Sequence, residues 1–164
     1  MLIRFNDVEF AKCVACRDEQ AINKAKFNQQ PKGWVPDEEN SDPDTSLRGV
    51  MSEYAAAQYF GITYKFDTLF DPNRTDLTNG CQVKASKHQR GHLIIKSYNK
   101  PGTYIASFAS IEMQLVNLVG WFDYVGDNIL QYKGHALAKF NQNDFWIPQA
   151  DLSPMRMLKE LLAS

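Results

Sequence analysis

Residues 7–27 restrict the fold more than any other part of the chain, because they form a long segment that contains neither proline nor glycine. Apolar side chains recur there at helical spacing, and Asn6 or Asp7 can cap the first turn. Residues 46–60 repeat this periodicity with an alanine-rich face, and Gly61 follows at the expected stop. The sequence therefore predicts two amphipathic helices in the N-terminal part of the chain.

Beyond Gly61 the pattern changes to short segments rich in β-branched and aromatic residues, which is typical of strands. We expect strands at residues 62–66, 80–85, 92–97, 104–110 and 115–124, an extended piece at 146–149, and a last helix at 151–162 that starts near Pro154. Turns are expected at Asp71-Pro72-Asn73 and Lys100-Pro101-Gly102. This order predicts an α+β fold with α/β/α-like layers, in which a central mixed sheet of four to five strands is flanked by helices.

The composition is that of an ordinary globular domain. With 164 residues, 44% hydrophobic and 23% charged, the chain fits one domain spanning residues 1–164. The net charge of −1 argues against a generally basic nucleic-acid coat and leaves room only for a local basic patch. No apolar run approaches the length of a bilayer span, and the first residues do not resemble a secretory signal, so we expect no membrane partner and a cytoplasmic location.

Residues 29–45 combine three prolines with an acidic cluster and little apolar content. This composition predicts a mobile, acidic surface loop, for which solvation is the simplest role. Gating of a groove or contact with a partner are the alternatives.

The three cysteines do not form a disulfide framework. Cys13 and Cys16 have a spacing seen in zinc sites, but a structural zinc ion needs four ligands and no second pair of suitable residues follows. Two thiols buried on a helix are the favoured interpretation. A zinc protein remains an alternative that stoichiometric zinc in the purified protein would establish.

A potential site for chemistry lies around residues 76–86. In a strand, Gln82 and Lys84 point to one face and Val83 points to the other, and Asp76 stands just before the turn that leads into the strand. A carboxylate, an amide oxygen and an ammonium would thus surround one small volume, which suits a hard divalent cation and hydrolysis of a phosphodiester. The alternative is an ordinary polar edge in which Asp76 caps a turn and Lys84 is solvated.

With Glu53 on the preceding helix, these residues resemble the active-site set of the PD-(D/E)XK nuclease superfamily. There a helix glutamate is followed by an aspartate and then by Glu/Gln-x-Lys on a strand. The first helix, residues 49–61, Val119-Gly120-Trp121 and residues 146–155 resemble a group of small, mostly phage-encoded members, so the likeness covers most of the chain except the acidic loop. It implies a restriction-endonuclease-like core and, if the protein is phage-encoded, a site of action in the cytoplasm of the host cell.

The resemblance also implies a role for each residue. Asp76 would bind the metal directly, Gln82 would add its side-chain oxygen and Val83 its backbone carbonyl. Glu53 would hold a water on the metal or assist a second ion, and Lys84 would position the attacking water and offset charge on the phosphate. The expected cofactor is Mg²⁺, with Mn²⁺ as a possible substitute, because the neutral Gln82 stands where many members have an acid and should weaken cation binding.

A basic segment follows the Lys84 strand. Ser86, Lys87, His88 and Arg90 are the expected nucleic-acid contacts, and His92 and Lys96 could extend the patch. A solvated hairpin edge is the alternative for the charged residues. We expect Tyr54, Trp121 and Trp146 to belong to the core rather than to stack on bases.

The expected function is a Mg²⁺-dependent deoxyribonuclease, a hydrolase that cleaves DNA by attack of a metal-activated water. The alternative is a catalytically inactive nucleic-acid-binding or protein-interaction module that retains the nuclease fold. Single-stranded, duplex and branched DNA, RNA, and endo- or exonucleolytic cutting all stay open at this point. A monomer and a homodimer are both compatible with the sequence.

Overall fold

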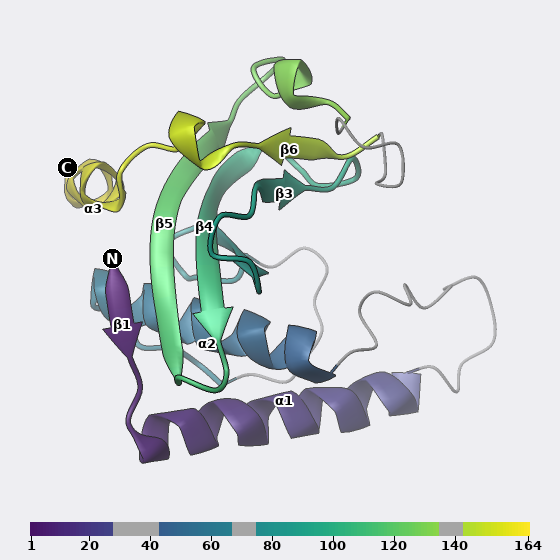
Figure 1. Cartoon of the computed structure of the whole chain (residues 1–164), viewed down its shortest axis with the longest axis vertical. Coiled ribbons are helices and arrows are strands. Elements are labelled where there is room, and N and C mark those ends of the chain that lie inside the picture. Colours follow the sequence, from purple (N-terminus) through teal and green to yellow (C-terminus); the bar gives the residue numbers. More distant parts are fainter. Residues whose placement is uncertain (28–42, 67–74, 135–142) are drawn as a thin grey trace.

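The computed structural model describes residues 1–27, 43–66, 75–134 and 143–164 (Figure 1). Most of the predicted acidic loop at 29–45, and the predicted turn at residues 71–73, lie outside this described part. The last three residues assigned to that loop, 43–45, instead form the first turn of a helix. Proline is well suited to such a first turn, because its fixed φ is helical and it lacks an N–H that would be left unpaired there.

Two helices form the N-terminal part, as predicted. Helix α1 spans Asp7–Phe27 and begins with a reciprocal cap, in which the Glu9 N–H donates to Asn6 Oδ1 and the Asn6 N–H donates to Glu9 Oε2, both at 2.9 Å. Helix α2 spans Pro43–Phe60 and ends at Gly61, whose φ of 69° lies in the left-handed region.

The main sheet has the strand order β1-β5-β4-β2. Its members are β1 (Leu2–Arg4), β2 (Gln82–Ser86), β4 (Gly102–Ser110) and β5 (Leu115–Tyr124). Strand β5 pairs antiparallel with β1 and with β4, whereas β2 pairs parallel with β4. The predicted α+β class with a mixed sheet is therefore confirmed, although β1 was not predicted.

A second, smaller sheet pairs β3 (Leu93–Ile95) antiparallel with β6 (Phe145–Ile147). Two short 3₁₀ turns, η2 (Leu130–Tyr132) and η3 (Gln149–Asp151), lie near it in sequence, and helix α3 (Met155–Ala163) follows Pro154. The predicted strand at 62–66 is wrong, because this segment has no regular secondary structure and pairs with no strand of the described ranges. Its aromatic rings, Tyr64 and Phe66, pack on Tyr54 of α2 instead.

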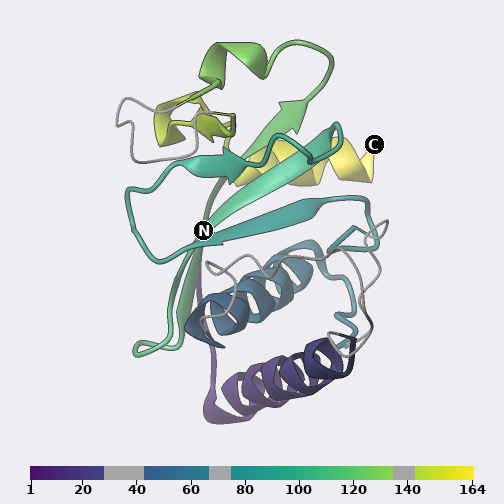
Figure 2. The ribbon, with the colours of Figure 1, turned by 90° about the vertical axis from the view of Figure 1, so that its right-hand side faces the viewer.

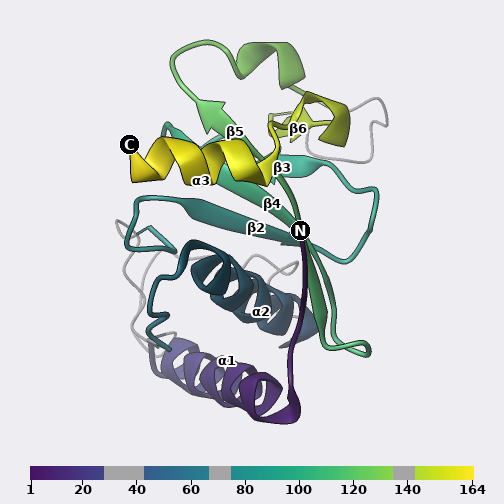
Figure 3. The ribbon, with the colours of Figure 1, turned by 90° about the vertical axis from the view of Figure 1, so that its left-hand side faces the viewer.

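The main sheet separates two apolar clusters. Figures 2 and 3 show α1 and α2 stacked on one side of β2 and β4, with β3 and β6 on the other side. Ile105 of β4 belongs to the cluster on the α2 side, whereas its neighbours Tyr104 and Ala106 join the cluster formed with β3 and β6. None of the helices in the described ranges is long and apolar enough to cross a membrane.

Candidate functional site

Asp76 contacts β2, the strand that carries Gln82, Val83 and Lys84. Its Oδ2 accepts a hydrogen bond from the backbone N–H of Val83 at 2.7 Å. The N–H and C=O of one residue in a strand point to the same side, so the Val83 carbonyl is directed to the edge where Asp76 lies. The Lys84 carbonyl is directed the other way and accepts a bond from Ser107 Oγ of β4 at 3.2 Å. The Asp76 carboxylate and the Val83 carbonyl therefore share one edge of β2.

A tight turn fixes the place of Asp76. The Leu77 N–H donates to the Cys81 carbonyl, and the Gly80 N–H donates to the Leu77 carbonyl, both at 3.1 Å. Gly80 has a φ of 87°, which a side chain would strain. Leu77 and Cys81 are both buried in the core. The buried side chains of Leu77 and Cys81 and the start of β2 thus hold Asp76 in place.

Gln82 and Lys84 share a face of β2, as the strand alternation predicts. Val83 between them is only 7% exposed and belongs to the core on the α2 side, while Gln82 and Lys84 are half-buried. Gln82 is the register partner of Tyr104, and the Lys84 Nζ lies 5.8 Å from the centroid of the Tyr104 ring. The amide and the ammonium therefore lie on the face of the sheet that Tyr104 occupies.

The electrostatics link Asp76 to Lys84. Burial raises the pKa of Asp76, and the hydrogen bond from Val83 and the charge of Lys84 offset part of that rise. Burial, followed by the charges of Tyr124 and Asp76, raises the pKa of Tyr104 to about 12. A desolvated carboxylate is unfavourable unless hydrogen bonds or a cation compensate it. With the Gln82 and Val83 oxygens on the same strand, this donor set fits a hard divalent cation.

Glu53 contacts Tyr64, a residue that the sequence reasoning missed and that borders the same pocket as Asp76. The Tyr64 hydroxyl donates to Glu53 Oε2 at 2.7 Å. Tyr64, Asp76 and Ala57 line one small pocket, and Ala57 lies one turn beyond Glu53 on the same face of α2. Burial, followed by the charge of Glu53, raises the pKa of Tyr64, so its hydroxyl stays protonated and donates. The sequence does carry a signal for this contact, because a tyrosine, whose ring ends in a hydroxyl group, follows the helix of Glu53 by a few residues.

The described part of the chain contains no group of three or more His, Cys, Asp or Glu side chains that could hold a metal ion. Two of the predicted ligands, the Gln82 side-chain amide and the Val83 backbone carbonyl, are not His, Cys, Asp or Glu side chains and so would not be counted in such a group. Cys13 and Cys16, the basis of the zinc alternative, are buried thiols. Burial is the main cause that raises the pKa of Cys13, to about 12, which disfavours the thiolate that zinc requires.

The predicted nucleic-acid contacts form a defined turn after β2, here called the basic loop (residues 86–91). Lys87, His88 and Arg90 are exposed. The Ser86 hydroxyl accepts the His88 N–H at 3.0 Å and donates to the His88 carbonyl at 3.3 Å. Ser86 therefore shapes the loop that presents the three basic side chains.

Gln149, in the C-terminal part of the chain, holds the far side of the basic loop. Its Nε2 donates to the carbonyls of Gln89 at 2.8 Å and Gly91 at 3.0 Å. A Cβ on Gly91 would lie 2.7 Å from Ser86 Oγ and 3.1 Å from the His88 carbonyl oxygen, so glycine suits the close approach there. Contacts at both ends thus define the conformation of the basic loop.

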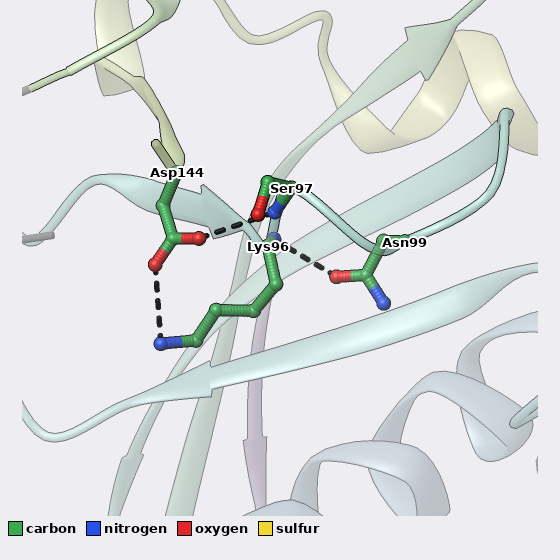
Figure 4. Close-up of polar contacts among 4 residues, drawn as sticks. All are labelled: Lys96, Ser97, Asn99 and Asp144. Atoms are coloured by element: carbon green, nitrogen blue, oxygen red, sulfur yellow. Dashed lines mark hydrogen bonds and ion pairs between the residues drawn. The ribbon is translucent and has the colours of Figure 1, made fainter. Parts of the chain in front are cut away.

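Lys96, which the sequence groups with the basic patch, is engaged elsewhere (Figure 4). Its Nζ lies 3.3 Å from Oδ2 of Asp144, an ion pair without hydrogen-bond geometry, and Asp144 is only 1% exposed. Asp144 Oδ1 accepts the Ser97 N–H at 3.1 Å, and Asn99 Oδ1 accepts the Lys96 N–H at 2.9 Å. The Lys96 ammonium therefore pairs with a buried carboxylate, which makes it less available to a ligand.

Comparisons of this chain with models of protein families, with curated proteins and with solved structures find no match.

Proposed function

We propose that this protein is a metal-dependent nuclease of the PD-(D/E)XK kind that hydrolyses phosphodiester bonds in DNA. The observation that carries the proposal is the 2.7 Å contact between Asp76 and the Val83 N–H, because it brings a carboxylate to the strand edge beside Gln82, the Val83 carbonyl and Lys84. These oxygens would hold Mg²⁺ or Mn²⁺. A bound cation would supply Lewis-acid activation of water and neutralise charge on the phosphate.

Lys84 would act on the phosphate. Its ammonium is near enough to Asp76 to offset part of the rise that burial causes in the pKa of that carboxyl group, and its Nζ lies 5.8 Å from the centroid of the Tyr104 ring. The ammonium would donate to a phosphate oxygen or to the attacking water and would offset the negative charge that develops in the transition state. This role explains why a lysine, rather than a neutral donor, follows Gln82 by two residues.

The neutral amide of Gln82 has a consequence for the metal. Asp76 would be the one charged protein ligand on this strand edge, with Glu53 contributing from the helix. Affinity for hard cations decreases when a site has fewer charged ligands, so we expect a high Mg²⁺ requirement and better activity with Mn²⁺, which accepts nitrogen and oxygen ligands more strongly.

The basic loop supports a polynucleotide as the substrate. A strand rises about 3.3 Å per residue, which places Ser86, where the basic loop begins, about 7 Å along β2 from Lys84. Phosphates that flank the scissile group lie within such a reach on a nucleic-acid strand. Lys87, His88 and Arg90 would therefore hold neighbouring phosphates and orient the substrate. A small phosphoester would have no use for them.

The proposed location is the cytoplasm. All three cysteines are buried thiols without a disulfide, which fits the reducing conditions found there. For a phage-encoded protein this would be the cytoplasm of the host cell, where DNA is accessible.

The test is a cleavage assay with the purified full chain. Labelled single-stranded, duplex and branched DNA, and RNA, are incubated in Mg²⁺ or Mn²⁺ with wild type, Asp76→Ala and Lys84→Ala. Asp127→Ala and Lys12→Ala are matched controls, because they remove the same side chains at exposed positions. We expect cleavage of DNA by wild type and both controls, and a decrease of at least two orders of magnitude in rate in both site variants. Equal cleavage by all five folded proteins would refute the assignment.

A catalytically inactive nucleic-acid-binding module is the second candidate. The basic loop favours this candidate, because contacts of Ser86, Gly91 and Gln149 hold the loop in place and none of these residues is a proposed metal ligand. This candidate predicts DNA binding in EDTA that Asp76→Ala does not alter, and no cleavage by wild type in either metal.

A further inference from the structure

We propose that Tyr64 is a positioning residue that holds Glu53 in the orientation required at the metal site. The inference rests on the proposed nuclease function. Its basis is geometric: the Tyr64 hydroxyl donates to Glu53 Oε2 at 2.7 Å, and the same tyrosine lines the pocket that Asp76 borders.

The Tyr64 ring is fixed by other rings. It packs at right angles on Phe66, with 4.9 Å between centroids, and edge-on against Tyr54 at 5.8 Å. Tyr54 and Phe66 in turn contact each other at 5.2 Å. Pairs at these separations are mutually attractive, and three together allow little rotation of any one ring. The hydroxyl is therefore presented to Glu53 at a defined place.

A fixed donor is useful to a glutamate in this position. Glu53 has a long side chain, and fixing that side chain in one orientation costs conformational entropy. Without Tyr64, this cost would fall on the binding of the metal. The hydrogen bond from Tyr64 orders Oε2 before any ligand arrives. A lysine or arginine in place of Tyr64 would also order the carboxylate, but its charge would compete with a cation. A neutral hydroxyl orders Glu53 and leaves its negative charge available.

Tyr54 provides a matched control within the same cluster. Its hydroxyl also donates to a glutamate, Glu9 Oε1 on α1, at 3.3 Å, and that oxygen additionally accepts Gln58 Nε2 at 2.7 Å. Tyr54→Phe thus removes one hydroxyl from the cluster without touching Glu53. Tyr64→Phe removes the other, and both variants keep the packed rings.

The experiment measures Mn²⁺ affinity of the full chain by electron paramagnetic resonance of unbound Mn²⁺, which needs no catalytic turnover. Removal of a group that orients a metal ligand typically weakens metal binding by about 10–100-fold. We expect Tyr64→Phe to weaken Mn²⁺ binding roughly tenfold and Tyr54→Phe to leave it unchanged. Melting temperatures in EDTA should change similarly in both variants.

A double-variant cycle tests whether Tyr64 acts through Glu53. In a Glu53→Gln background, Tyr64→Phe should cause no further decrease in Mn²⁺ affinity. Additive decreases, equal decreases in both tyrosine variants, or unchanged affinity in Tyr64→Phe would each overturn the positioning role and leave the nuclease proposal standing. If wild type and Asp76→Ala bind Mn²⁺ equally weakly, the nuclease proposal itself fails, and this result differs from each of the outcomes above.

Discussion

Nζ of Lys96 lies 3.3 Å from Oδ2 of Asp144, which links the residue after β3 to the residue before β6. Asp144 is almost fully buried and also accepts the Ser97 N–H, so its removal takes a buried carboxylate away from the Lys96 ammonium and from a backbone donor. Because the Lys96 side chain is 32% exposed, the main loss is the buried acceptor, and leaving a buried hydrogen-bonding group unsatisfied typically costs about 1–3 kcal/mol. We predict a decrease of this size in the free energy of unfolding for Asp144→Ala, measured by urea denaturation.

The control for this prediction is a pair on α2 whose acidic member is exposed. Arg48 and Asp44 lie 3.6 Å apart, four residues apart in sequence, with the Asp44 side chain 58% exposed. Asp44→Ala should cost no more than about 1 kcal/mol, because such surface pairs contribute little. Similar decreases in the two variants would contradict a special role for the buried pair.

Asp76→Asn should make the metal-free protein more stable at neutral pH. Burial is the first cause of the raised pKa of Asp76 in the folded state, so the folded protein favours the protonated form. Its contribution to stability is present below the unfolded-state pKa of about 3.9 and disappears as the pH rises through the raised folded-state pKa. We expect a gain of about 0.5–2 kcal/mol at pH 7, as is common when a functional group is removed, and no gain near pH 3.

Urea denaturation in EDTA at both pH values measures this difference. Adding Mn²⁺ at pH 7 should then stabilise wild type more than Asp76→Asn, because a cation bound only to the folded state raises its stability. A variant that is less stable than wild type at pH 7 in EDTA would show that the carboxylate is structurally favourable.

Gly120 of β5 is predicted to tolerate no side chain. A Cβ there would lie 2.8 Å from both Leu152 Cβ and the Ser153 carbonyl oxygen, where the chain before α3 pairs with Trp121. Overpacking of this kind costs about 1–3 kcal/mol, so Gly120→Ala should lower the melting temperature. Gly49→Ala on α2 is the opposite case. A Cβ at this position would meet nothing within 4 Å, and alanine is more favourable than glycine in a helix by about 1 kcal/mol. Equal shifts in melting temperature would refute the prediction.

The basic loop should determine the salt dependence of DNA binding. Lys87→Ala combined with Arg90→Ala should reduce the slope of log K against log salt concentration by about 0.9 for each duplex phosphate that the variant no longer neutralises. Gln149→Ala should weaken binding less, because it loosens the loop without removing charge. Fluorescence anisotropy with a labelled duplex in EDTA measures the affinity of each protein. Lys12→Ala on α1 is the control and should keep the wild-type slope, so a matching change there would indicate a general charge effect.

Local chemistry explains which elements were predictable from sequence. The start of α1 follows from the Asn6–Glu9 cap and its continuity from the absence of proline and glycine, and β5 follows from its long apolar and aromatic run. Strand β1 has only three residues, too few for a periodicity, and exists through its pairing with β5. The alternating Tyr64 and Phe66 mimic a strand, but their rings pack on α2 instead.

The same distinction holds for the candidate site. The common face of Gln82 and Lys84 follows from strand alternation, and the identity of Asp76 is visible in the sequence. The bond from Val83 to Asp76 depends on the turn around Gly80, and the bond from Tyr64 to Glu53 depends on how an irregular segment returns to α2. Contacts of this kind arise from tertiary packing, which a repeating pattern of residue types does not encode.

Strand β2 stands at the end of the strand order, and terminal strands of a sheet tend to recruit strands from other molecules through their unpaired N–H groups. Asp76 occupies one of these donors, the Val83 N–H. Its carboxylate therefore also discourages β-type self-association, and Asp76→Ala is expected to aggregate at lower protein concentrations than wild type. The residue proposed for metal binding thereby contributes to keeping copies of the chain apart.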